Sequence, residues 1–149
     1  MNETMDGGGL PASLGEAIGT EPLWLQAWVL TMVLVHLASL LFVAGREQQQ
    51  WRFRLEPLAI FVSFVVAAVI MSWIYDRFGY VRLLGLAHLV AWTPVYVWIL
   101  RSRQRFPVGT MYGKYIYLYL LIAGVSLVID AVDVVRWLAG DGDLFLRWS

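Results

Sequence analysis

The stretch YIYLYLLIAGVSLVIDAVDVVRWLA, residues 115–139, decides how this chain folds. Its first fifteen residues, up to Ile129, carry no formal charge and are mostly apolar. A continuous apolar run of this length favours a membrane-crossing helix over a barrel strand, because barrel strands alternate and are about half as long. Two aspartates and an arginine then appear before the apolar pattern ends.

The composition predicts that lipid is the solvent for much of the surface. The chain has 149 residues, of which 60% are hydrophobic and 15% charged, whereas a soluble domain averages roughly 45–50% apolar and about 25% charged residues. A small domain cannot hide such a surplus inside itself. The formal net charge is zero, which does not indicate a nucleic-acid partner. The chain has no cysteine, which excludes disulfides, thiolate metal sites and a thiol nucleophile.

Three further uncharged runs lie earlier in the chain, at residues 23–44, 58–75 and 83–100, so that residues 115–139 contain the fourth. Each is long enough to cross a hydrocarbon core of ~30 Å at ~1.5 Å per residue. The second and third runs have only 18 residues, near the lower limit. Short connections, 46–56 among them, predict antiparallel neighbours. We therefore predict an all-α fold, an integral membrane bundle of four antiparallel transmembrane helices, with residues 23–139 as one membrane domain.

The two tails predict little structure of their own. Residues 1–22 form a flexible segment, in which Leu10, Leu14, Ala17 and Ile18 repeat at helical spacing and predict a short helix on the outer membrane surface. Residues 140–149 form a short C-terminal tail. Its Asp-Gly-Asp sequence at 141–143 lacks the other ligands of a calcium loop and favours a solvated turn.

Basic residues in the connections predict the orientation. Connections 46–56 and 101–114 together carry seven lysines and arginines, whereas the opposite side carries four. We therefore expect a multi-pass protein of the bacterial inner (plasma) membrane with both termini outside. Arg101, Arg103 and Arg105 set this topology, and they also have the charge to bind anionic lipid headgroups.

One polar stripe runs along the last helix. Helical spacing places Tyr119, Ala123, Ser126, Asp130, Asp133 and Trp137 on one side, while the opposite positions hold leucine, isoleucine and valine. Small and polar residues are typical of helix–helix contacts in membranes. The stripe is therefore predicted to face the bundle or a neighbouring subunit.

The two aspartates of this stripe are costly. Asp130 lies about 12 Å along the helix from Leu138 at ~1.5 Å per residue, and a carboxylate at that depth costs at least a few kcal/mol unless it is paired, hydrated or neutralised. Asp130 and Asp133 are also helical neighbours, so their charges repel. We expect one of them to stay protonated near neutral pH.

Other polar residues reach the same outer layer. His88 lies about 8 Å into the third run, and Gly85 beside it permits close approach of another helix. The predicted ion or proton site consists of Asp130, Asp133, His88, Asp76 and Arg136. Equal numbers of acids and bases also suit a purely structural ion-pair network, with Asp133 paired to Arg136 three residues on.

Neither a cofactor nor catalysis is indicated. His36 and His88 together suggest haem ligation, but His36 lies about 20 Å from its helix start and His88 only about 8 Å. We expect His36 to hydrogen-bond Ser39 or a neighbouring helix instead. The sequence contains no Gly-rich phosphate loop, HExxH motif or serine elbow, so we expect no enzyme and no cofactor, and it leaves any metal undetermined.

Three functions remain open. The first is a small membrane protein that handles protons or cations, with Asp130 and Asp133 as carriers, His88 as proton exchanger and Arg136 tuning them. Four helices are too few to enclose a generous pore, so such a protein works as a homo-oligomer or with a membrane-complex partner. The second is a non-catalytic accessory or structural subunit, and the third is a cofactor-binding electron-transfer subunit.

The orientation is testable directly. An epitope tag at either terminus is expected to be accessible from the outer side of intact cells, because the more basic connections stay in the cytoplasm. A tag that antibody reaches only after the membrane is permeabilised would contradict the orientation.

Overall fold

The computed structural model describes residues 11–47 and 49–141. Helices dominate it: a short helix α1 (Leu14–Gly19) precedes four long ones, which are α2 (Leu23–Ala38), α3 (Leu55–Phe78), α4 (Gly85–Arg101) and α5 (Met111–Leu138). Three 3-10 turns lie between them, at η1 (Ser39–Phe42), η2 (Arg82–Leu84) and η3 (Arg103–Arg105). Two short strands, β1 (Ala44–Glu47) and β2 (Gln50–Phe53), connect α2 to α3.

All four predicted apolar runs are helical. Taken with their flanking 3-10 turns, the segments Leu23–Phe42, Leu55–Phe78, Arg82–Arg101 and Met111–Leu138 are each long and apolar enough to cross a membrane. The short length predicted for the second run was wrong, because α3 has 24 residues. Its first turn takes in Glu56 and Pro57, which suit a helix start, and its last turn takes in Arg77, which complements the negative helix end.

The all-α prediction needs one correction, in connection 46–56. The strands β1 and β2 pair antiparallel, with Ala44 opposite Phe53 and Arg46 opposite Trp51. The backbone groups that face each other across the two strands are paired. Such pairing matters near lipid, where water is not available as a partner. Gln49 at its turn has a φ of 66°, the left-handed conformation that tight hairpin turns require. This hairpin also ends the first span at Phe42 rather than at residue 44.

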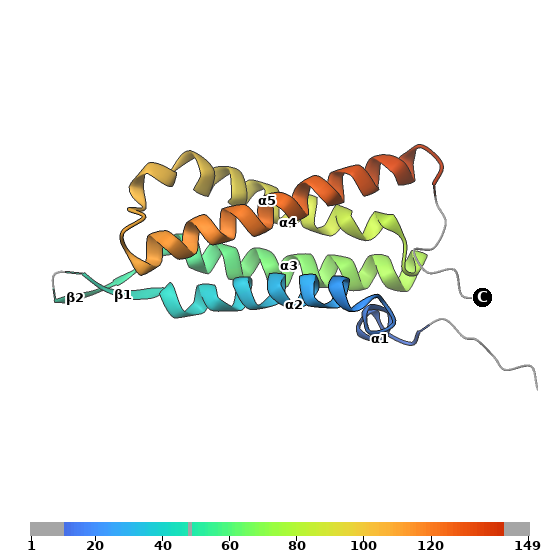
Figure 1. Ribbon diagram of the computed structural model, residues 1–149, viewed down its shortest axis with the longest axis horizontal. Coiled ribbons are helices and arrows are strands. Elements are labelled where there is room, and N and C mark those ends of the chain that lie inside the picture. Colours follow the sequence, from blue (N-terminus) through green and yellow to red (C-terminus); the bar gives the residue numbers. More distant parts are fainter. Residues whose placement is uncertain (1–10, 48, 142–149) are drawn as a thin grey trace, which may run out of the picture.

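The four long helices pack side by side, with the most extensive contacts between α3 and α4 and between α4 and α5. Helix α2 contacts both α3 and α5. In Figure 1, α2 and α3 run alongside one another, while α5 crosses α4 near the middle of the molecule. The hairpin and η3 lie at one end, and α1 and the end of α5 lie at the other. The four long apolar helices are present as predicted. Because α5 crosses α4 in Figure 1, a regular antiparallel four-helix bundle stays a prediction.

Helix α5 separates apolar and polar residues as predicted. Tyr119 and Ala123 are completely buried, and Ser126 is nearly so. On the opposite side, Leu121 is 63% exposed and Val128 66% exposed. Large apolar side chains are likewise exposed along α2 and α3. So much exposed apolar surface is unfavourable in water and suits a surrounding of acyl chains.

The predicted N-terminal helix is present as α1. Its N-cap is Ser13, whose hydroxyl accepts a hydrogen bond from the Glu16 amide at 3.2 Å. The Tyr75 hydroxyl of α3 donates to the Pro11 carbonyl at 2.6 Å, and Ala17 is completely buried. This segment is therefore packed onto the helix ends. Leu10 and residues 142–149 lie outside the described residues.

Candidate site in a charged layer and a buried ring cluster

The centre of the candidate site is a contact between α4 and α5. Nδ1 of His88 lies 2.9 Å from Oδ2 of Asp130. The Ser126 hydroxyl, one turn earlier on α5, reaches the same oxygen at 3.2 Å. An ionised carboxylate only accepts hydrogen bonds, so both His88 Nδ1 and the Ser126 hydroxyl donate to it. The side chains of His88 and Asp130 are only 13% and 15% exposed.

Gly85 makes this contact geometrically possible. A Cβ at that position would lie 2.9 Å from Oδ1 and 3.1 Å from Cα of Asp130. Such distances are too short for a methyl group, so any larger residue would push α5 away from α4. The close approach expected of Gly85 is confirmed, and it brings the first turns of α4 against the Asp130 region of α5.

A charged layer lies beside this pair, at the end of α5. Arg82 Nη1 contacts Asp133 Oδ1 at 2.7 Å, and Arg82 Nε contacts Asp141 Oδ2 at 3.2 Å. Arg136 Nη2 lies 2.9 Å from the same Asp141 oxygen. The predicted pairing of Asp133 with Arg136 was wrong, because the η2 turn presents Arg82 to Asp133 and Arg136 instead reaches outward to Asp141. Two arginines thus balance two aspartates.

Asp130 and Asp133, one of which we expected to stay protonated, have different hydrogen-bond partners. Asp133 has the Arg82 guanidinium, and Asp130 has the His88 imidazole and the Ser126 hydroxyl. Each carboxylate is therefore stabilised independently of the other. That one of them remains protonated stays a prediction.

Asp76 does not join this group. It is exposed at the end of α3. Its neighbours are engaged elsewhere: Tyr75 bonds the Pro11 carbonyl, Arg77 lies over the Trp73 ring at 5.3 Å, and Ser72 bonds the carbonyl of Ala68. The structure thus brings His88, Asp130, Asp133 and Arg136 into one region but leaves Asp76 outside it.

A cluster of rings continues inward from His88. The indole of Trp92 stacks on the His88 ring, with centroids 4.0 Å apart, and on the His36 ring, with centroids 4.3 Å apart. Phe64 of α3 stacks on His36 at 5.2 Å, and Tyr119 of α5 meets it edge-on at 5.6 Å. All four long helices therefore contribute to one buried ring cluster, formed by His36, Phe64, His88, Trp92 and Tyr119.

The prediction for His36 was wrong in its partner. Its Nδ1 contacts the carbonyl of Met32 on its own helix at 2.7 Å, and the Ser39 hydroxyl donates to the His36 backbone carbonyl rather than to the ring. The imidazole is completely buried. The Trp92 indole stacks on both imidazole rings and so bridges the difference in depth that the sequence predicts between the two histidines.

Three polar atoms of the ring cluster are buried and have no hydrogen-bond partner in residues 11–47 and 49–141: His36 Nε2, Trp92 Nε1 and the Tyr119 hydroxyl. Buried tryptophan and tyrosine usually satisfy their polar atoms. Such groups cost more in an apolar surrounding than in water.

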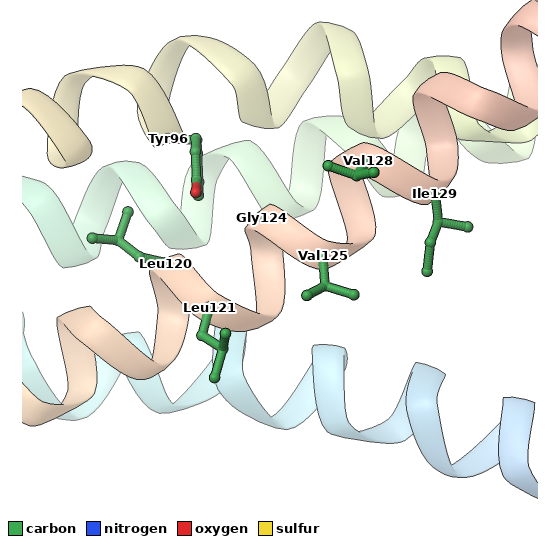
Figure 2. A pocket seen from close by; sticks show the side chains of 7 residues that line it. All are labelled: Tyr96, Leu120, Leu121, Gly124, Val125, Val128 and Ile129. Atoms are coloured by element: carbon green, nitrogen blue, oxygen red, sulfur yellow. The ribbon is translucent and has the colours of Figure 1, made fainter.

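An apolar groove of about 460 Å³ is formed by Tyr96 of α4 and by residues of α5. Figure 2 shows the Tyr96 side chain between α4 and α5, beside Gly124, with the other lining side chains along α5. A Cβ on Gly124 would lie 2.6 Å from the Tyr96 hydroxyl, so glycine permits this crossing. The other lining residues are Leu120, Leu121, Val125, Val128 and Ile129. With almost no polar atoms, the groove suits acyl chains rather than an ion.

The predicted headgroup-binding arginines lie at the other end of the molecule. Arg101, Arg103 and Arg105 are all exposed, at the end of α4 and in η3. Figure 1 places this segment at the same end as the hairpin. Arg103 donates to the Leu100 carbonyl at 3.1 Å. Their binding of lipid headgroups stays a prediction.

Among the described residues outside the four apolar segments, one carboxyl has a shifted pKa. Burial raises the pKa of Glu21 above its usual value, while its hydrogen bond with Tyr80 partly opposes the shift. Burial, together with the charge of Glu21, raises the pKa of Tyr80. This contact ties the start of α2 to the connection before η2, and so helps to position Arg82.

Comparisons with known proteins add no relative. The chain matches no protein family, no curated protein sequence and no solved structure. Its class rests on its own residues: four apolar helices of membrane-crossing length suggest a multi-pass membrane protein.

Sequence reasoning missed three members of the site. Arg82 was one of several bases near the outer layer, and nothing in its spacing distinguished it from Arg77. For Asp141 the sequence predicts a solvated turn. In the structure the chain reverses at Gly140, with a φ of 103°, and brings Asp141 back to Arg82. Trp92 lies four residues after His88 and therefore on the same side of its helix, but only the packing of α2 shows that it also contacts His36.

The charged layer predicts strong coupling between Arg82 and Asp133. Both side chains are 19% exposed, so Arg82→Gln and Asp133→Asn should each lower the free energy of unfolding by about 2 kcal/mol, between surface and buried pairs. The double variant should lose at least about 1 kcal/mol less than the sum of the two. Thermal unfolding in detergent micelles measures this cycle. Strict additivity would contradict the pairing. Arg52→Gln, at an exposed position of β2, is the control, with a change within about 0.5 kcal/mol.

Proposed function

We propose that this protein spans the membrane four times, with both termini outside, and that it exchanges protons across the bilayer through the His88–Asp130 pair. The observation that carries the proposal is the 2.9 Å contact between His88 Nδ1 and Asp130 Oδ2, on helices of membrane-crossing length. Histidine and carboxylate residues inside membrane segments commonly mark proton paths. Imidazole titrates near neutral pH, which suits repeated loading and release.

Charge balance supports a proton as the species handled. The two arginines of the charged layer, Arg82 and Arg136, are paired with Asp133 and Asp141. Asp130 therefore has His88 as its only potentially cationic partner in these contacts. An ionised Asp130 is best compensated in lipid when His88 also carries a proton.

A bound metal cation has less support. Within the described residues, no three histidine, aspartate or glutamate side chains come together as ligands. Hard cations take six or more oxygen ligands, and zinc takes four. One imidazole and one carboxylate are enough to hold a proton, so a proton fits this site better.

The exchange step uses the two ring nitrogens differently. His88 Nδ1–H remains bonded to the Asp130 carboxylate, and this bond sets the ring orientation. Nε2 takes up a proton from the outer side, giving an imidazolium whose charge Asp130 stabilises. Loss of the same proton restores the neutral ring. Asp130 thus stabilises the loaded state, and Ser126 holds the carboxylate in place.

The membrane setting completes the proposal. The seven lysines and arginines of connections 46–56 and 101–114 support our proposal that this end lies in the cytoplasm, and we assign the protein to a bacterial inner membrane. Four helices leave little room for a wide pore, so a continuous path is formed in a homo-oligomer or with a membrane partner. The exposed apolar side of α5 is available for such packing.

A second candidate, a non-catalytic structural subunit, is favoured by the charged layer itself. The contacts of Arg82 with Asp133 and Asp141, together with Arg136 and Asp141, join η2 to the end of α5. Such a network stabilises helix ends without moving any ion. In that case the His88–Asp130 pair contributes to stability alone.

Reconstituted liposomes separate the two candidates. Under an imposed pH gradient, the wild-type protein should carry protons, and Asp130→Asn should lower the rate at least about tenfold, because the neutral amide no longer stabilises the imidazolium. Asp76→Asn, an aspartate that lies outside the pair, is the matched control and should retain the rate. A pH-sensitive dye trapped in the liposomes gives the measurement.

Two results would count against proton exchange. One is a wild-type rate equal to that of empty liposomes. The other is an Asp130→Asn variant that carries protons as fast as the wild type. Loss of thermal stability in Asp130→Asn without any proton transport would support the structural subunit.

A further inference from the structure

The buried ring cluster contains a donor and an acceptor that cannot satisfy each other. His36 Nδ1 lies 2.7 Å from the Met32 carbonyl. A carbonyl only accepts, so Nδ1 carries the hydrogen, and the neutral ring leaves Nε2 as a bare acceptor. Trp92 Nε1 is a donor only. The two rings are stacked at 4.3 Å, with an interplanar angle of 28°, so their in-plane polar atoms do not point at each other.

The third unpartnered group belongs to another helix. The Tyr119 ring of α5 meets His36 edge-on, at an interplanar angle of 83°. Its hydroxyl both donates and accepts. His36, Trp92 and Tyr119 are all at most 1% exposed. An acceptor, a donor and a hydroxyl thus gather from α2, α4 and α5, each without a partner in the described part of the chain.

We propose that His36 Nε2, Trp92 Nε1 and the Tyr119 hydroxyl together bind a buried water molecule, through which His36 serves as a second proton-exchanging residue. Water fits this set because it accepts from the indole and donates to the imidazole and the hydroxyl. Two to four polar partners are what a buried water requires. A larger polar ligand does not fit among rings whose centroids lie 4.3–5.6 Å from the His36 ring.

The relay step, unlike the water site, rests on the proposed function. Protonated His88 passes its Nε2 proton through one further water molecule to the bound water, which gives a proton to His36 Nε2, so that both water molecules end neutral. His88 returns to the neutral form, and His36 becomes an imidazolium whose Nδ1–H still donates to Met32. One proton moves inward and no electrons are exchanged. The Trp92 indole, which stacks on both imidazoles, also stabilises the charge on either ring by cation–π attraction.

The titratable side chains packed around His36 come from α4 and α5. Of the groups packed around it, α4 supplies His88 through Trp92, and α5 supplies Tyr119. The Tyr115 hydroxyl donates to the carbonyl of the adjacent Val35 at 3.0 Å. None of these groups is a carboxylate, so no anionic side chain among them pairs with a protonated His36.

Solid-state NMR tests the water site without any transport assay. In bilayers of phosphatidylcholine and phosphatidylglycerol, magnetisation from water protons should reach Trp92 Nε1–H several-fold faster than the backbone amide of the completely buried Ile60. Trp92→Phe assigns the indole signal, and Tyr119→Phe should weaken the transfer. Equal transfer at Trp92 and Ile60 would show a dry cluster and overturn the water site.

Proton transport then tests the relay. In liposomes, His36→Gln should lower the proton rate about tenfold or more. Ser63→Ala, a buried α3 residue whose hydroxyl bonds the Ile60 carbonyl, should keep it. If Asp130→Asn abolishes transport but folded His36→Gln leaves it unchanged, the relay is overturned and the proposed function stands. If the wild type carries no protons, the relay falls with the proposed function, while the NMR result still decides the water site.

Discussion

A carboxylate inside an apolar helix must find a partner, and the packing of α5 follows from how Asp130 does so. The cost of an unpaired charge at that depth exceeds most single packing contacts, so the helix turns Asp130 away from lipid. Gly85 then lets α4 approach closely enough for His88 to reach it. Once this contact is fixed, the α5 positions on the same stripe, Tyr119 and Ser126, are buried as well.

The same constraint arranges polar groups along the whole group of helices. At one end, Arg82 and Arg136 balance Asp133 and Asp141. Further from this end, the polar atoms between the helices belong to aromatic side chains, in the ring cluster around Trp92. Outside, the surface is apolar, including the groove beside Tyr96. The core itself is mostly apolar, and its few buried polar side chains lie at contacts between the helices, as is typical of helix–helix contacts in membranes. The candidate site and the ring cluster therefore both lie at contacts between helices.

Much of the fold was predictable because long apolar runs have one common solution, the helix. The inward stripe of α5 was predictable from periodicity alone, and depth assigned His88 to the same outer layer, but its contact with Asp130 was not predicted. The hairpin was not predictable, since the sequence of residues 44–53 carries no strong strand pattern, and pairing answers a backbone requirement. The partner of Asp133 depended on the η2 turn and on the chain reversal at Gly140, which are tertiary features. The Trp92 contact with His36 depended on which helices are neighbours, which one sequence does not reveal.

The most direct test of the central claim is the distance between His88 and Asp130 in a lipid bilayer. The chain has only two histidines, so solid-state NMR with ¹⁵N-labelled histidine and ¹³C-labelled aspartate resolves the coupling between His88 Nδ1 and Asp130 Cγ. The structure predicts a strong coupling, since Nδ1 and Oδ2 are 2.9 Å apart, and its loss in His88→Gln. A wild-type protein in bilayers with no coupling between these atoms would show that the pair does not form, and the proposed site would be wrong.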